Sequence, residues 1–203
     1  MKKSSKSSRP MNTQVFMALS LLNDLKAAAF DALLKKRKGP ALLLLYSFID
    51  ICASLANADP HTKLPDRFKS YLKTHALCRW SLFSPDDLWA ARCSLLHAYS
   101  PFGDHTKKRN GAKPIFYYAW PEKPDTLEML LQSRGQKNFV IVDVKQIKSI
   151  ALSAFNSLFR ELEEDPTLEA TVASNAKQLL RMIHDIHIEQ FMEWTGDEKT
   201  LLD

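Results

Sequence analysis

The chain has 203 residues, enough for one domain with a hydrophobic core, and 45% of them are hydrophobic while 25% are charged. Only 5 residues are glycine, which argues against an all-β fold with many tight turns. The three cysteines form no C-x-x-C pair, which argues against a disulfide scaffold or a zinc site and favours a reducing, cytoplasmic compartment.

The net charge of +5 is unevenly distributed along the chain. Residues 1–113 hold 19 Lys and Arg against 8 Asp and Glu, whereas residues 114–203 hold 9 against 15. A basic front half favours an anionic partner at one end of the molecule, and nucleic acid is the most common such partner. A solvated charged surface would explain the same numbers.

The first part of the chain divides into a tail and two helices. Residues 1–11 read as a disordered basic tail, which fits a nucleic-acid-binding arm, a cloning remnant or a segment without function. Residues 12–203 read as a single helical domain. Apolar residues at three- and four-residue steps predict a helix over Thr13–Lys38, with Gly39 as its stop signal. A second helix over Pro40–Ala58 is apolar nearly all round, as in the centre of a bundle.

Two further helices are predicted before residue 100. A short helix follows a proline-containing loop, with Phe68, Tyr71 and Leu72 facing inward. The run Ser84–Asp87 opens the next helix, because it supplies a capping serine, a proline at the first position and acids in the first turn. Ser100–Pro101 closes that helix.

Residues 114–143 are predicted to form a small β insert. Ile115–Trp120 and Phe139–Val142 are rich in aromatic and β-branched residues, which is typical of strands. A short helix is expected between them, near Asp125–Gln132. The two strands would form a small β ribbon beside the helical bundle.

Two long helices, Val144–Glu164 and Pro166–Thr195, are predicted to close the chain, so the fold class is mainly α. No segment reaches the roughly 18 apolar residues of a membrane span, and no membrane association is expected. His184 and His187 have a spacing that a metal could use, but no cysteine or well-placed carboxylate completes the set. We therefore expect no metal and no cofactor.

Two lone opposite charges stand on predicted core helices. Asp50 is the only charge within its apolar helix, and Arg92 is the only one between Leu88 and Leu96. A charge on a buried helix is costly unless it has a partner. We therefore predict that Asp50 pairs with Arg92 and orients it. The alternative is that each side chain reaches solvent separately.

Arg92 and His97 are the residues best suited to chemistry. Histidine gives and takes a proton near neutral pH, and the arginine fork matches phosphate oxygens. Together they suit RNA cleavage, with His97 as acid or base and Arg92 stabilising the charge that develops on the phosphorus. On an ideal helix these residues point about 140° apart, so a working site needs the helix to end near His97 or a second copy of the chain.

The stretch Arg92-Cys93-Ser94-Leu95-Leu96-His97-Ala98-Tyr99 resembles the R-x4–6-H motif of the HEPN superfamily. Its R-x4-H-x-Y form is similar to the toxin half of nucleotidyltransferase–HEPN toxin–antitoxin pairs. The resemblance implies a bundle of four to five helices that dimerises and cleaves RNA without a metal, with Arg92 and His97 as catalytic residues. It also implies a possible nucleotidyltransferase-type antitoxin that modifies Tyr99. Cys93 departs from the polar residue usual after the arginine.

The loop after the motif carries three cations that are candidates for contacts with the RNA backbone: Lys107, Lys108 and Arg109. Three aromatic residues of the β insert have the chemistry for stacking on bases, but aromatic residues in strands more often pack: Tyr117, Tyr118 and Trp120. We favour packing for all three.

The leading hypothesis is a cytoplasmic, homodimeric HEPN-type endoribonuclease that acts as a toxin or defence effector. Its catalytic residues are Arg92 and His97, with Asp50 behind them and Tyr99 as a contact or modification point. A second hypothesis is a non-catalytic HEPN-like module that binds RNA, a nucleotide or a protein. A third is a structural helical protein in which the motif is a coincidence at a helix end.

Overall fold

The computed structural model of the chain describes residues 11–76, 82–98, 101, 103, 111–119 and 121–195, with the backbone alone for residues 97, 98 and 181–195. Within these ranges lie seven helices and two strands: α1 (Thr13–Leu34), α2 (Lys38–Leu55), α3 (Leu64–His75), α4 (Pro85–Ala98), β1 (Ile115–Tyr118), α6 (Pro124–Ser133), β2 (Val140–Asp143), α7 (Val144–Glu164) and α8 (Pro166–Thr195). The mainly helical fold class is confirmed. Apart from Met11, the predicted basic tail lies outside the described residues.

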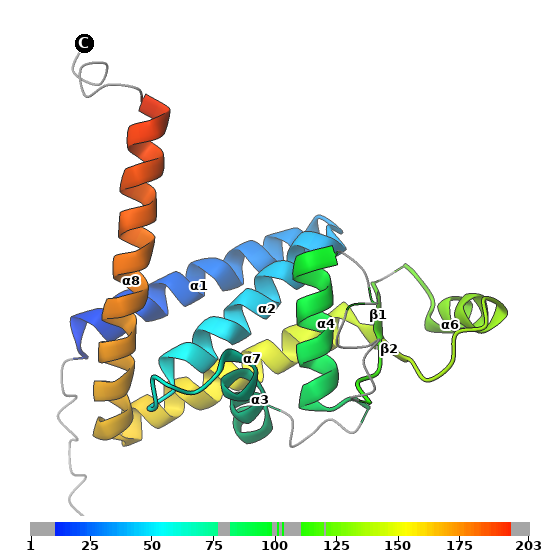
Figure 1. Cartoon of the computed structure of the whole chain (residues 1–203), viewed down its shortest axis with the longest axis horizontal. Coiled ribbons are helices and arrows are strands. Elements are labelled where there is room, and N and C mark those ends of the chain that lie inside the picture. Colours follow the sequence, from blue (N-terminus) through cyan, green and yellow to red (C-terminus); the bar gives the residue numbers. More distant parts are fainter. Residues whose placement is uncertain are drawn as a thin grey trace, which may run out of the picture.

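Helices α1, α2 and α7 run side by side and form the body of the molecule (Figure 1). Helices α3 and α4 lie across one side of this body, and α8 crosses one end, with its later half projecting past α1. The β insert and α6 lie at the opposite end. The arrangement is a helical bundle with a small sheet attached at one end.

Helix α1 ends earlier than its sequence pattern predicts, at Leu34 instead of Lys38. Lys36 adopts a left-handed conformation, with φ of 56°, and the Arg37 amide donates to the Ala32 carbonyl at 2.8 Å. This is a Schellman-type helix end with a lysine where glycine is usual. Gly39, which the sequence marks as the stop signal, lies instead in the first turn of α2.

Replacing Lys36 with glycine is expected to raise the free energy of unfolding by about 1 kcal/mol, because glycine adopts positive φ without the penalty of a side chain. The matched control is Lys35→Gly, since Lys35 caps the same helix at φ of −79°. That variant is expected to lower stability. Urea denaturation followed by circular dichroism compares the two, and a loss of stability in Lys36→Gly would contradict this description of the helix end.

Helix α2 begins at Lys38 and ends at Leu55, so it starts two residues earlier and stops three residues sooner than predicted. It contacts α1, α3, α4, α7 and α8, and its residues Tyr46, Phe48 and Ile49 are almost fully buried. By length and composition alone it is also the one described helix able to cross a membrane, and half of that stretch is buried. Its apolar composition is explained by its position as the core helix that the other helices pack against.

Helices α3 and α4 form as the sequence predicts. Phe68, Tyr71 and Leu72 are buried, and the Tyr71 hydroxyl donates to the Ala154 carbonyl at 2.9 Å, which attaches α3 to α7. At the start of α4, Ser84 and Asp87 cap each other's backbone amides at 3.1 and 2.8 Å. This reciprocal cap fixes where α4 begins and therefore where its later residues point.

The β insert contains the two predicted strands and the predicted helix between them. The strands β1 and β2 are parallel, with Ile115 opposite Val140 and Tyr118 opposite Asp143. The insert is therefore a strand–helix–strand unit, not a ribbon joined by a turn, because parallel strands need a connection that returns along the sheet. Lys38 attaches the insert to α2 by donating to the Tyr117 carbonyl at 3.1 Å and to Glu122 at 2.8 Å.

The two closing helices have the predicted bounds. Asp143 ends β2 and forms a capping box with Gln146 at the start of α7. At the other end of the bundle, the Asn175 side chain of α8 donates to the carbonyls of Ser54, Leu55 and Asn57 at 2.8–3.2 Å. This amide satisfies carbonyls at the end of α2 and holds α8 against it.

Candidate functional site

Asp50 and Arg92 meet where α2 and α4 pack against each other. Arg92 donates to Asp50 Oδ2 from Nε at 2.8 Å and from Nη2 at 2.7 Å. The side chains are only 15% and 14% exposed, so the pair is shielded from water. The predicted pairing is therefore present in a single copy of the chain, whereas the catalytic roles of these residues stay a prediction.

An aromatic stack fixes the Arg92 guanidinium from a second side. Its central carbon lies 5.1 Å from the centre of the Trp89 ring, one turn earlier on α4. The Trp89 ring packs in turn against Phe68 of α3 at a centroid distance of 5.4 Å. Cation–π contact and the ion pair together hold the guanidinium in one orientation.

Asp50 is only partly satisfied by this arrangement. Burial raises the pKa of its carboxyl, and the charges of Arg92 and Arg67 act in the opposite direction. Its second oxygen, Oδ1, is buried and accepts no hydrogen bond from the described residues. Asp50 therefore keeps one buried acceptor beside two arginines, a polar centre within an otherwise apolar helix.

His97 lies close to the end of α4, which continues to Ala98. Because both residues are on this helix, the backbone directs Arg92 and His97 about 140° apart. Joining both groups at one phosphate therefore requires a contribution from a second copy or from the segment after the helix. The side chain of His97 lies outside the described residues, as do Tyr99, Lys107, Lys108 and Arg109 entirely.

The residues after Arg92 face the protein interior. Cys93 is 9% exposed, and burial raises the pKa of its thiol. Ser94 is 2% exposed, and a side chain at Gly103 would collide with its hydroxyl. The segment that follows α4 therefore returns onto the motif-bearing helix at Gly103, a close approach that no sequence signal indicates.

Of the three aromatic residues for which packing is predicted, Tyr117 packs against the described core. The Tyr117 hydroxyl lies 2.5 Å from that of Tyr46 on α2, and burial raises the pKa of both. Tyr117 is thus partly buried and packs against the core, as the packing interpretation predicts. Tyr118 is half-buried, and Trp120 lies outside the described residues.

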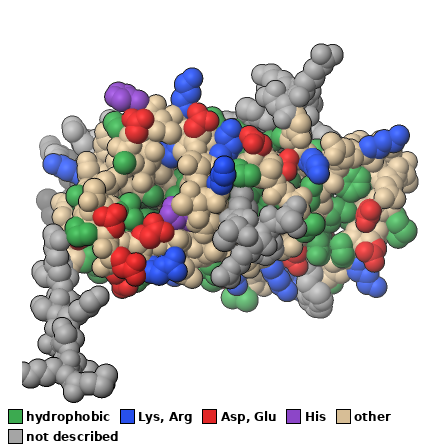
Figure 2. Space-filling model, turned by 90° about the horizontal axis from the view of Figure 1, so that it is seen from below, with side chains coloured by type: hydrophobic (Ala, Val, Ile, Leu, Met, Phe, Trp, Pro, Cys, Tyr) green, Lys and Arg blue, Asp and Glu red, His purple; other side chains and the backbone are tan. Residues whose placement is uncertain are grey.

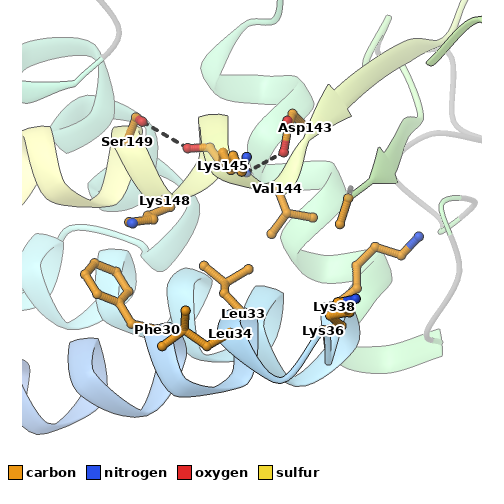
Figure 3. Close-up of a pocket in the computed structure, with 11 residues that line it drawn as sticks. Phe30, Leu33, Leu34, Lys36, Lys38, Asp143, Val144, Lys145, Lys148 and Ser149 are labelled. Carbon is orange, nitrogen blue, oxygen red and sulfur yellow. Dashed lines mark hydrogen bonds between the residues drawn. The ribbon is translucent and has the colours of Figure 1, made fainter. Parts of the chain in front are cut away.

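A cavity of about 640 Å³ lies between the end of α1 and the start of α7. Phe30 and Leu33 face Val144 across it, with Lys36 and Lys148 at its edges (Figure 3). Lys148 lies 4.2 Å from the centre of the Phe30 ring. None of the described motif residues lines this cavity, and neither Asp50 nor Arg92 does, so it is separate from the Asp50–Arg92 pair.

A second and more polar cavity, of about 220 Å³, lies between α2 and α3 and contains Arg67 and His75. The sequence alone does not indicate that Arg67 is a functional residue, because an arginine on a short amphipathic helix usually lies on a solvated surface. Its charge nevertheless acts on Asp50. The polar centre at Asp50 therefore extends to α3.

The face of the molecule drawn in Figure 2 carries Lys and Arg side chains interspersed with Asp and Glu side chains. The basic side chains coloured on that face thus form no uniform basic surface. Among the described residues, no three His, Cys, Asp or Glu side chains are grouped as metal ligands. The side chains of His184 and His187 lie outside that search.

No family model matches the chain, and no curated protein or solved structure matches it either.

Proposed function

We propose that the chain is a metal-independent endoribonuclease of the HEPN type, in a HEPN-like helical bundle. The observation that carries the proposal is the shielded Asp50–Arg92 pair at the centre of the bundle, on the same helix as His97. A held arginine followed by a histidine near the helix end supplies a fixed positive charge and a proton carrier. Those are the two kinds of group that RNA cleavage without a metal requires.

In the proposed reaction, His97 removes the proton from a ribose 2′-hydroxyl, and that oxygen attacks the adjacent phosphorus. The bond from phosphorus to the 5′-oxygen of the next nucleotide breaks, and the leaving oxygen receives a proton from a second imidazolium. Arg92 donates to the phosphate oxygens on which negative charge develops. The products are a 2′,3′-cyclic phosphate and a 5′-hydroxyl.

A homodimer completes this reaction scheme. Two motifs that face one cleft bring the Arg92 of one copy near the His97 of the other, although the two residues point about 140° apart on one helix. They also supply the two proton-transfer groups. In the same proposal, Lys107, Lys108 and Arg109 bind the RNA backbone and Tyr99 contacts substrate or is modified by a nucleotidyltransferase-type antitoxin. The setting proposed is the cytoplasm, in a toxin or defence role.

One observation favours a second candidate, a non-catalytic module that binds RNA, a nucleotide or a protein. Asp50 engages two nitrogens of Arg92, and Cys93 turns into the core where HEPN nucleases usually have a polar residue. Fewer Arg92 donors then remain for a phosphate.

Incubation of the purified chain with total RNA in excess EDTA separates the two candidates. The nuclease is expected to shorten the RNA, and binding is followed in the same samples by native gel electrophoresis. Shifted but intact RNA would support the binding module and contradict the nuclease. Neither cleavage nor binding of RNA would contradict the nuclease and an RNA-binding module, and would favour a module for a nucleotide or protein, or a structural helical protein.

A further inference from the structure

The cavity between α2 and α3 has an unusual lining for its size. Three of the residues that line it are Ala53, Ala56 and Tyr71. The other six are polar: Asn57, Thr62, Arg67, Ser70, Thr74 and His75. Its volume of about 220 Å³ is far above the space that one water needs and below the usual range for drug-sized ligands. It suits a single charged group with part of its carrier.

Arg67 is the residue that points to a ligand. Its Nε is buried and donates to none of the described residues, and none of their carboxylates pairs with it within 4.0 Å. Arginine keeps its charge at all relevant pH values, so this N–H group always belongs to a cation and favours an anionic acceptor. A buried donor without an acceptor is unfavourable, so an anion that pairs with this guanidinium is favoured.

Two carboxylates that bond to residues of the cavity lining are engaged with their own neighbours. Asp59 accepts from the His61 amide at 2.9 Å and from the Thr62 hydroxyl at 3.1 Å. Glu161 accepts from Ser157 at 2.9 Å and lies 3.1 Å from His75 Nδ1. Both are therefore held by their own neighbours, while the Arg67 donor and the hydroxyls of Ser70 and Thr74 are left for a ligand.

We propose that this cavity binds a phosphate group, with Arg67 as its main contact and the hydroxyls of Ser70 and Thr74 as further donors. The guanidinium fork matches two phosphate oxygens, and hydroxyl donors complete the shell of an ion that only accepts. Ala53, one helical turn after Asp50 on α2, lines the cavity, so the cavity lies close to the acidic member of the candidate catalytic pair. If the proposed function holds, the group is a backbone phosphate of the RNA, next to the one that is cleaved.

The test is a titration of the isotope-labelled chain with inorganic phosphate, followed by backbone amide NMR. Saturable shifts are expected at residues around the cavity. Arg67→Met is expected to weaken binding about tenfold or more, because it removes a charge-assisted contact. The matched control is Lys69→Met, which removes the same charge from the same helix, where Lys69 pairs with Asp66 and Asp86. It is expected to leave the affinity within twofold.

Two ligands distinguish the possible sources of the phosphate. A non-cleavable 2′-O-methyl oligoribonucleotide that binds more tightly than adenosine monophosphate, and loses that advantage in Arg67→Met, identifies the RNA backbone. Equal binding of the two identifies a free phosphate or nucleotide site. The proposal is overturned when phosphate causes no saturable shift, or when Arg67→Met binds it as the wild type does.

The amide spectrum also reports whether Arg67→Met is folded. Should that variant unfold, Thr74→Val at the cavity edge replaces it, with a loss of about fivefold to tenfold expected for one hydroxyl contact. Unchanged affinity in Thr74→Val would then count against the proposal. Phosphate binding is measured without cleavage, so a chain that binds phosphate but leaves RNA intact contradicts the proposed nuclease and not this site.

Discussion

Arg92→Met is expected to lower the free energy of unfolding by about 3 kcal/mol, because it leaves the Asp50 carboxylate buried without its main partner. The pair is about 15% exposed, which places the effect at the lower end of the range for buried pairs. Arg160→Met, the same change at an exposed site on α7, is the control and is expected to have little effect. Urea denaturation at neutral pH measures both.

The same variant has a predictable pH dependence. Burial already raises the pKa of Asp50, and removing Arg92 takes away an influence that lowers it, so the pKa rises further. A carboxyl whose pKa is raised in the folded state destabilises the fold at pH values above its unfolded pKa of about 3.9. At pH values below that pKa, it does not destabilise the fold. The deficit of Arg92→Met against wild type is therefore expected to shrink as the pH falls towards 4. A deficit that is constant with pH would show that Asp50 is not the cause.

A double variant separates the charge from the packing. Asp50→Leu combined with Arg92→Met removes both ends of the pair and is expected to recover much of the lost stability. If the double variant is as unstable as the sum of the single variants, the two side chains do not interact. Recovery of stability without recovery of RNA cleavage would support the idea that the pair is kept for function.

His97→Ala is expected to reduce RNA cleavage at least 100-fold, which is the usual effect of losing a general acid or base. The fold should be unaffected, because His97 lies next to the last residue of α4. His61→Ala, at an exposed loop histidine, is the control and should retain full activity. The rate of fragment formation from a defined RNA measures both. Equal rates in wild type and His97→Ala would remove His97 from the mechanism.

Much of the fold follows from local patterns in the sequence. Apolar spacing and caps predict both closing helices, the inward residues of α3 and the start of α4, since Ser84 and Asp87 cap it as their types suggest. The end of α1 is not predictable in this way. Lys36 takes the left-handed conformation normally given to glycine, while Gly39 is available three residues later. The chain direction needed to bring α2 back along α1 decides this position, and propensity does not.

The candidate site divides in the same manner. The Asp50–Arg92 pair is predictable, because an isolated charge on an apolar helix needs a partner and the chain offers one of opposite sign on another core helix. Arg67 is not predictable, because its interest comes from a donor left over after packing, which only the folded chain reveals. The close approach of Gly103 to Ser94 is hidden for the same reason.

The most direct test of the central claim is the chemistry of the RNA ends produced in excess EDTA. Wild-type chain and His97→Ala are incubated with total RNA, and the fragments are treated with and without a phosphatase that acts only on phosphate monoesters. Fragments from wild type alone, with cyclic-phosphate ends that resist the phosphatase until acid opens them, are the predicted result. Intact RNA with wild type, or equal fragments from both proteins, would contradict the proposal that this chain is a HEPN-type ribonuclease.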